Sequence, residues 1–181
     1  DNVLGASNVE ACKQASENDA TACFIIDGTT ASMYGVIGSS TPQLVADLVE
    51  KHGDVKQINM INVPGSLDDV ANLKASVIVR KNGINTHLPT GSMIASGGVD
   101  FFIAGVKRSA ETKVSVGVHS WSDEGNKQAS DLPRNSPEHQ PYIKYYREMS
   151  LADPEGFYFF TIYAATADSI HEMSPDEISH Y

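Results

Sequence analysis

Hydrophobic residues are distributed along the chain in short runs that predict alternating strands and helices. Apolar runs bounded by turn residues are typical of buried strands. Here they are CFIID at 23–27, YGVIG at 34–38, QINMINV at 57–63, INTHL at 84–88 and VSVGVHS at 114–120. Strands that alternate with helices pair in parallel through right-handed crossovers, so the pattern over 23–120 predicts an α/β fold with a parallel sheet.

Three helices are expected between these strands, because apolar residues recur there at the spacing of one helix face. The first begins at Thr41 and ends before Gly53. The second is expected to begin with Ser66 as its cap, and its expected buried face consists of Val70, Leu73 and Val77. The third begins at Ser96 and is apolar nearly all round, which predicts a buried helix.

The two ends of the chain differ from this middle part. Residues 1–22 are mostly polar and predict a surface helix or arm. Residues 121–180 are expected to be helical after a polar loop, 121–141, that could serve as a lid or a partner surface. Three helix starts are marked by a cap residue followed by proline, namely Ser136, Asp153 and Ser174. A chain of 181 residues with 41% hydrophobic residues predicts a single domain over 1–181.

Charge and composition exclude several classes of partner. The formal charge is −10 and the 13 basic residues are scattered, which argues against nucleic-acid binding. The longest apolar stretch, 156–167, is too short to span a bilayer. Six histidines lack the HExxH spacing of a zinc site, and no cofactor is expected.

The cysteines and the first residue concern localisation. Cys12 and Cys23 are the only cysteines, and their spacing favours one disulfide over a metal site, with two buried thiols as the alternative. A disulfide is typical of an exported protein, so a periplasmic or secreted location is expected. The start at Asp1 rather than Met fits a removed upstream segment, which is either a signal peptide or a boundary at which a longer chain was cut.

Two loops at the carboxyl ends of strands, 62–69 and 95–100, carry the candidate chemistry. Each leads through glycine into a helix whose first amides lack acceptors, which is what an oxyanion hole requires. Ser96 would lie between them, and His119 at the end of the next strand could act as its general base. The alternatives are that Ser96 only caps a helix, with Asp100 in the first turn, and that His119 is an ordinary histidine.

The run SGGVDFFIAGVKR from Ser96 onward resembles the active-serine segment of the Clp protease proteolytic subunit and its crotonase-like relatives. In that family the helix ends in Ala-Gly followed by basic residues, as at 104–108 here. The segment VPGS at 63–66 is similar to the family's oxyanion loop, and His119 lies 23 positions after Ser96. The stretch 167–177 resembles the segment that carries the acid, which would be Asp168.

The resemblance implies a crotonase-like fold of repeated ββα and βα units, and a serine peptidase that acts on peptides or proteins and forms a homo-oligomer. The implied triad is Ser96, His119 and Asp168, and the implied oxyanion-hole residues are Gly65, Ser66 and Gly97. Asp131 and Asp153 remain alternatives for the acid.

Two residues depart from the pattern of the family. Ser66 replaces a second glycine, and Gly97 stands where Clp subunits carry a larger side chain, which is expected to widen the oxyanion hole.

Other interpretations fit parts of the sequence. An α/β-hydrolase elbow requires glycine where Ile94 stands. A crotonase acting on acyl thioesters would not need a serine paired with a histidine. The main alternative is a catalytically silent crotonase-like domain used for binding or assembly. The dense aromatic residues of 142–160 suit core packing or a subunit interface.

Overall fold

The computed structural model describes residues 2–181, which form two compact units. One unit ends at Ser115 and the other spans Val116–Tyr181. The structure fixes the fold of each unit, so the single domain over 1–181 stays a prediction.

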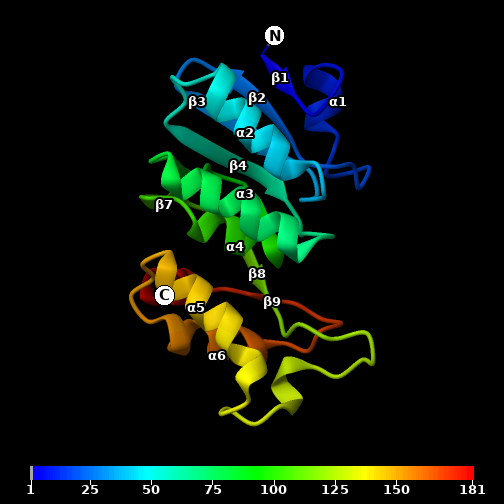
Figure 1. Cartoon of the computed structure of the whole chain (residues 1–181), viewed down its shortest axis with the longest axis vertical. Coiled ribbons are helices and arrows are strands. Elements are labelled where there is room, and N and C mark those ends of the chain that lie inside the picture. The colour runs from blue at the N-terminus through cyan, green and yellow to red at the C-terminus, as the bar shows by residue number, and fades with distance from the viewer. Residues whose placement is uncertain (1) are drawn as a thin grey trace. The chain divides into compact units, whose positions relative to one another are not determined.

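The N-terminal unit alternates strands and helices as expected (Figure 1). Its strands are β1 (Val3–Leu4), β2 (Cys23–Asp27), β3 (Thr30–Tyr34), β4 (Gln57–Val63), β5 (Asn85–Leu88), β6 (Met93–Ala95) and β7 (Arg108–Ala110). Its helices are α1 (Val9–Lys13), α2 (Thr41–Lys51), α3 (Asp69–Lys81) and α4 (Gly97–Ile103). The parallel pairing is confirmed for β3 with β4, β4 with β5 and β6, and β5 with β7, whereas β1, β2 and β3 pair antiparallel.

Strand β4 pairs with two different strands along one of its sides. Its first residues pair with β5, from Gln57 to Asn59, and its last two pair with β6, where Val63 lies opposite Ile94. The chain leaves β4 and β6 at the same end, so the loop after Val63 and the turn after Ala95 emerge side by side. This is the position that parallel sheets give to ligand sites.

The buried face of α3 differs from the expected one. Helices α2 and α3 pack side by side (Figure 1). Helix α3 buries small and polar residues, namely Ala71, Asn72, Ala75, Ser76 and Val79. The side chains of Val70 and Leu73 are 64% and 42% exposed. The prediction was wrong because it placed the largest side chains inward, whereas close packing between helices selects small ones. The cap is Asp68 rather than Ser66, since Asp68 Oδ1 accepts from the amide of Ala71.

The strand expected at 34–38 is also placed differently. Strand β3 ends at Tyr34, because Gly35 has a φ of 101° that interrupts the extended chain. Beyond it, Val36 and Ile37 make only isolated parallel bridges, to Thr21 and Ser66. Strands β6 and β7 were not predicted, because three residues are too few for a period of two to be recognised.

The disulfide between Cys12 and Cys23 is confirmed. It joins α1 to β2, and the expected N-terminal arm is therefore a short helix, capped by Asn8, that is covalently attached to the sheet. Val3 and Ala15 complete a small apolar cluster around the two cysteines.

The C-terminal unit is mainly helical, as expected. Its helices are α5 (Gln140–Glu148), α6 (Pro154–Ala164) and α7 (Pro175–His180). Strand β8 (Ser115–Val118), whose first residue is the last of the N-terminal unit, pairs antiparallel with β9 (His171–Glu172). Asp153 and Ser174 cap α6 and α7 as predicted. Ser136 precedes a short 3-10 turn, Pro137–His139, and makes no capping hydrogen bond.

A chain of hydrogen bonds centred on the buried Tyr158 and His139 organises this unit. The indole of Trp121 donates to the hydroxyl of Tyr158, 3.0 Å away, and this hydroxyl lies 2.7 Å from Nδ1 of His139. The Nε2 of His139 lies 3.0 Å from the carbonyl of Pro133 and must donate to it. In the neutral form of His139, Nδ1 therefore accepts the proton of the Tyr158 hydroxyl. Burial raises the pKa of Tyr158 to about 12.

None of the helices described in residues 2–181 is both long enough and apolar enough to cross a membrane.

Candidate functional site

Ser96 occupies a sharp turn between β6 and α4. Its φ of 52° and ψ of −121° lie in a region that residues other than glycine rarely adopt, and such strain is typical of functional positions. The side chain makes no capping hydrogen bond to α4, so the simple capping role considered above is wrong.

The segment 65–67 runs beside this turn and is held by Ile37. The amide of Ile37 donates to the carbonyl of Gly65, at 3.0 Å, and the amide of Leu67 donates to the carbonyl of Ile37, at 2.9 Å. Because both flanking residues bond to Ile37, Ser66 directs its own amide to the opposite side of the extended segment. A Cβ placed on Gly65 would lie 4.0 Å from the Cβ of Ser96.

Gly97 and Ser66 fit against each other. A Cβ on Gly97 would overlap the Cβ of Ser66 and would lie 3.2 Å from the Ser66 nitrogen. The side chain of Ser66 therefore fills the space that Gly97 leaves open. The expectation that Gly97 widens the hole is wrong, because the two departures from the family pattern compensate each other. The structure thus brings together Gly65, Ser66, Ser96 and Gly97.

Asn72 was missed by the sequence analysis. It lies on α3, only 2% exposed, and its Nδ2 donates to the carbonyl of Gly97 at 2.9 Å. This bond fixes the peptide that follows Ser96. The signal, a lone asparagine inside a helix, was hidden because the wrong face of α3 was expected to be buried. Gly98 allows the start of α4 to pack closely against the end of β4, because a Cβ at this position would overlap the carbonyl of Val63.

His119 follows the last residue of β8, as predicted. Its Nδ1 lies 2.7 Å from the carbonyl oxygen of Ser120, which can only accept, so Nδ1 carries the proton. Neutral His119 therefore has its lone pair on Nε2, the form that a general base needs. The carbonyl is well fixed, because Ser120 is fully buried and its amide donates to the carbonyl of Ala165 at 2.9 Å.

Asp168 lies exposed in the loop between α6 and β9. The hydroxyl of Thr166 donates to its Oδ1, at 2.6 Å, and this hydrogen bond holds the pKa of Asp168 below its usual range. The two alternative acids have capping roles: Asp131 accepts from the amide of Gln128, and Asp153 caps α6. The assignment of His119 and Asp168 to the site stays a prediction.

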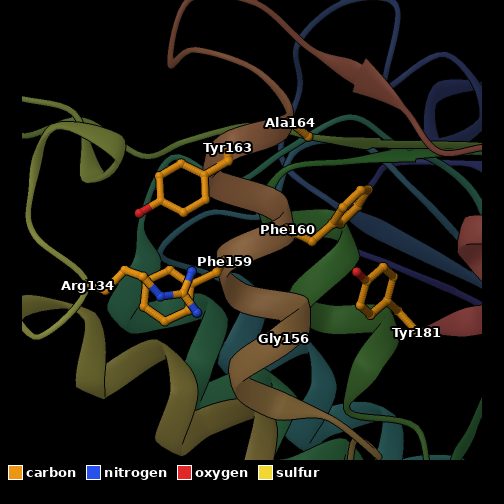
Figure 2. Close-up of a pocket in the computed structure, with 7 residues that line it drawn as sticks. All are labelled: Arg134, Gly156, Phe159, Phe160, Tyr163, Ala164 and Tyr181. Atoms are coloured by element: carbon orange, nitrogen blue, oxygen red, sulfur yellow. The ribbon is translucent and has the colours of Figure 1, made fainter.

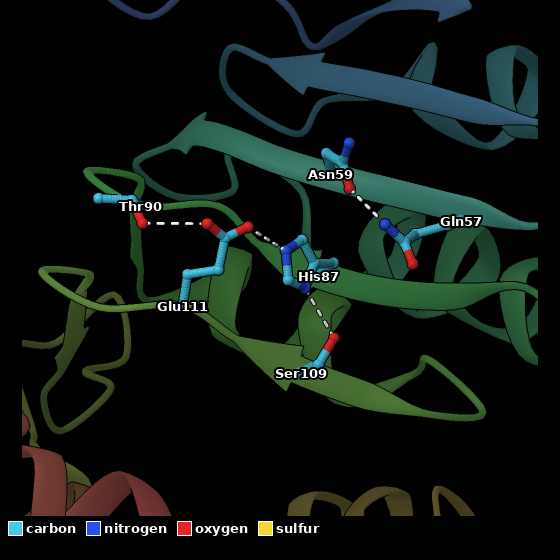
Figure 3. Close-up of polar contacts among 6 residues, drawn as sticks. All are labelled: Gln57, Asn59, His87, Thr90, Ser109 and Glu111. Atoms are coloured by element: carbon cyan, nitrogen blue, oxygen red, sulfur yellow. Dashed lines mark hydrogen bonds and ion pairs between the residues drawn. The ribbon is translucent and has the colours of Figure 1, made fainter. Parts of the chain in front are cut away.

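A second polar cluster lies on β5 and β7 (Figure 3). The imidazole of His87 contacts Ser109 through Nδ1 and Glu111 through Nε2, each at 2.7 Å. Thr90 donates to the other oxygen of Glu111, and the bonds from His87 and Thr90 lower the pKa of Glu111. Within residues 2–181, no group of three or more His, Cys, Asp or Glu side chains could hold a metal ion.

Neither a protein-family model nor a curated protein sequence matches the chain significantly. Solved structures do match. One is a serine-to-alanine mutant of the 1510-N membrane-bound stomatin-specific protease, aligned over 83% of this chain and 73% of that one, with a TM-score of 0.55 and 16% identity. The fold of this chain resembles that of a protease.

A lysine-to-alanine mutant of the same protease, in complex with a substrate peptide, aligns over 85% of this chain and 80% of that one. The TM-score of this match is 0.41 and the identity is 13%. At the 16% identity of the first match, the likeness concerns the mixed α/β fold alone. The crotonase-like repeats and a Clp-type subunit stay predictions.

Proposed function

We propose that this protein is a serine peptidase that cleaves peptide bonds with Ser96 as its nucleophile. The observation that carries the proposal is the strained turn at Ser96, which lies against the Gly65–Ser66 segment in a fold that resembles a protease. Strained serines next to converging main-chain amides are what acyl transfer requires.

The proposed reaction begins when Ser96 Oγ attacks the substrate carbonyl and passes its proton to Nε2 of His119. The main-chain amides of Ser66 and Gly97 would donate to the oxyanion, and Gly65 would line the same oxyanion hole. Collapse of the tetrahedral intermediate returns the proton from His119 to the leaving amine, and water then hydrolyses the acyl-enzyme by the same steps.

The carbonyl of Ser120 would hold the tautomer of His119, and Asp168 is proposed to stabilise the imidazolium. This carboxylate is ionised at neutral pH, and the hydrogen bond from Thr166 lowers its pKa further. The tautomer of His119 does not depend on Asp168. We therefore expect kcat of the Asp168→Asn variant to fall by less than the roughly 10⁴-fold seen in triads whose acid also sets the tautomer.

Substrate, assembly and location are part of the same proposal. The substrate is proposed to be a peptide or protein, and the assembly a homo-oligomer. The disulfide between Cys12 and Cys23 supports a periplasmic or secreted location.

The test is labelling by a fluorophosphonate probe, with adducts mapped by mass spectrometry. We expect an adduct at Ser96 that disappears in Ser96→Ala and falls steeply in His119→Ala. Ser109 is an internal control, because its exposed hydroxyl also contacts a histidine. Labelling of Ser109 as fast as Ser96 would mean that the probe reports exposure rather than a site.

Activity on a peptide library provides the second readout. Well-folded protein that gives neither an adduct at Ser96 nor cleavage would contradict the proposal and favour a catalytically silent binding domain. Cleavage that survives in His119→Ala but is lost in Ser96→Ala would rule out His119 as the base and leave Ser96 as the nucleophile.

A further inference from the structure

The C-terminal unit contains a cavity of about 400 Å³ along α6 that the proposed peptidase chemistry does not use. Figure 2 shows aromatic side chains on either side of this helix, with Gly156 and Ala164 between them. Its volume lies within the range of ligand sites, roughly 300–1,000 Å³, and suits a ligand with one ring.

Aromatic pairs form the two walls. On one side Phe159 stacks with Tyr163, with ring centroids 6.0 Å apart. On the other side Phe160 stacks with Tyr181 at 4.8 Å. A Cβ on Gly156 would overlap the carboxylate of Asp153, so glycine at this position makes room for the residue that caps α6. Phe159 is buried, so the aromatic surface open to a ligand is that of Tyr163 on one side and of the half-buried Phe160 and Tyr181 on the other. A planar apolar group can contact these rings.

Arg134 adds a positive charge to the first wall. Its guanidinium carbon lies 3.8 Å above the centre of the Phe159 ring, so the group lies against the ring (Figure 2). Stacking leaves the N–H groups at the edge of the guanidinium plane able to donate. Within residues 2–181, the structure records neither a carboxylate nor a carbonyl that accepts from Arg134.

We propose that this cavity binds an aromatic carboxylate, with its ring between the aromatic walls and its carboxylate on Arg134. A planar guanidinium matches a carboxylate through two parallel hydrogen bonds, and stacking on Phe159 holds it in one orientation beforehand. The ligand is a free aromatic acid or the C-terminal Phe or Tyr of a peptide, since both present the same groups. The proposal does not depend on the role of Ser96.

The test is an NMR titration of the intact protein that follows the ring signals of Phe159 and Tyr163 and the guanidinium signal of Arg134. The probes are N-acetylphenylalanine, N-acetylphenylalaninamide and N-acetylalanine, so that the carboxylate and the ring are removed separately. We expect saturable shifts with the first probe, and binding at least about tenfold weaker with the other two.

Arg134→Met tests the proposed carboxylate contact, and Arg147→Met is the matched control. Arg147 is also an exposed arginine of this unit and does not line the cavity. We expect Arg134→Met to weaken N-acetylphenylalanine binding by about tenfold or more while Arg147→Met leaves it unchanged. Circular dichroism verifies that both variants are folded.

A peptide that ends in phenylalanine, compared with its amidated form, distinguishes the two sources of the ligand. Binding of the free-acid peptide as tightly as the amino-acid derivative assigns the cavity to peptide C-termini, and weaker binding assigns it to free aromatic acids. Equal affinity for the acid and the amide overturns the proposal, as does the absence of saturable shifts at millimolar concentrations.

Discussion

Replacement of Gly97 by alanine tests how tightly the proposed oxyanion site is packed. The new Cβ would overlap the Cβ of Ser66 and would lie 3.0 Å from Nδ2 of Asn72, which is closer than ordinary contact. Both neighbours are fixed, because Asn72 is buried and bonded to the Gly97 carbonyl, and the segment around Ser66 is held by Ile37. The strain therefore cannot be relieved by rotating a side chain.

Overpacking of this kind costs about 1–3 kcal/mol of unfolding free energy. If the two loops separate to make room, the amides of Ser66 and Gly97 move apart, and the rate of acylation should fall by about 10²–10³, the effect of losing one oxyanion donor. The matched control is Gly53→Ala, because a Cβ on Gly53 would meet only the carbonyl of Val49, at 3.7 Å.

A second substitution tests whether the Cβ of Ser66 is the cause of the clash. Ser66→Gly removes the Cβ that blocks Gly97→Ala, and by itself costs about 1 kcal/mol, since the Ser66 hydroxyl exchanges hydrogen bonds with the main chain of Asp68. In the double variant the clash is largely removed. The two substitutions should therefore be coupled by about 1–2 kcal/mol.

The assay must report on the N-terminal unit. The single tryptophan, Trp121, lies in the other unit, so its fluorescence is unsuitable. Hydrogen exchange of the α4 amides gives the local free energy, and the rate of fluorophosphonate labelling at Ser96 gives the reactivity. Additive effects of the two substitutions, or Gly97→Ala as stable as Gly53→Ala, would refute the packing argument.

Three further predictions concern the rest of the chain. Tyr158→Phe leaves an indole donor and an imidazole acceptor without their partner, so tryptophan fluorescence should show a loss of about 2–3 kcal/mol in urea unfolding, whereas the exposed Tyr163→Phe should change little. Replacing both Cys12 and Cys23 by serine should cost about 2–3 kcal/mol through the lost loop closure, measured by hydrogen exchange in β2; unchanged exchange would contradict this. Hydrogen bonds from the amide of Ser174 and then from the imidazole of His171 lower the pKa of Glu177. The contribution of the ionised Glu177 to folding stability is therefore present above its ordinary pKa of about 4.3, and it is lost as the pH falls through the lower pKa of the folded state. The stability difference between wild type and Glu177→Gln should therefore shrink between pH 7 and pH 3, and a constant difference would count against the linkage.

The alternation of strands and helices could be predicted because it depends on local patterns. The runs at 23–27 and 57–63 and the cap at Asp153 each specify their element within a few residues. The face of α3 could not be predicted in this way. Which residues it buries depends on how closely neighbouring helices approach, and that is set by residues far away in the sequence.

The candidate site was predicted in part. The spacing of glycine and serine in two loops was enough to bring Gly65 and Ser96 together, because parallel strands leave the sheet at the same end. The sequence could not show that the side chain of Ser66 fills the space beside Gly97, because this is a contact between residues 31 positions apart. Asn72 was missed for the same reason.

The hydroxyl of Tyr158 connects two residues near the ends of the polar loop 121–141. Trp121, the first residue of the loop, and His139, near its end, both form hydrogen bonds with this hydroxyl. Both ends of the loop are therefore attached by hydrogen bonds to the same residue of α6. Any movement of this loop is confined to the exposed residues 123–127, because Gln128 accepts from the amide of Ala167 and Ala129 is fully buried.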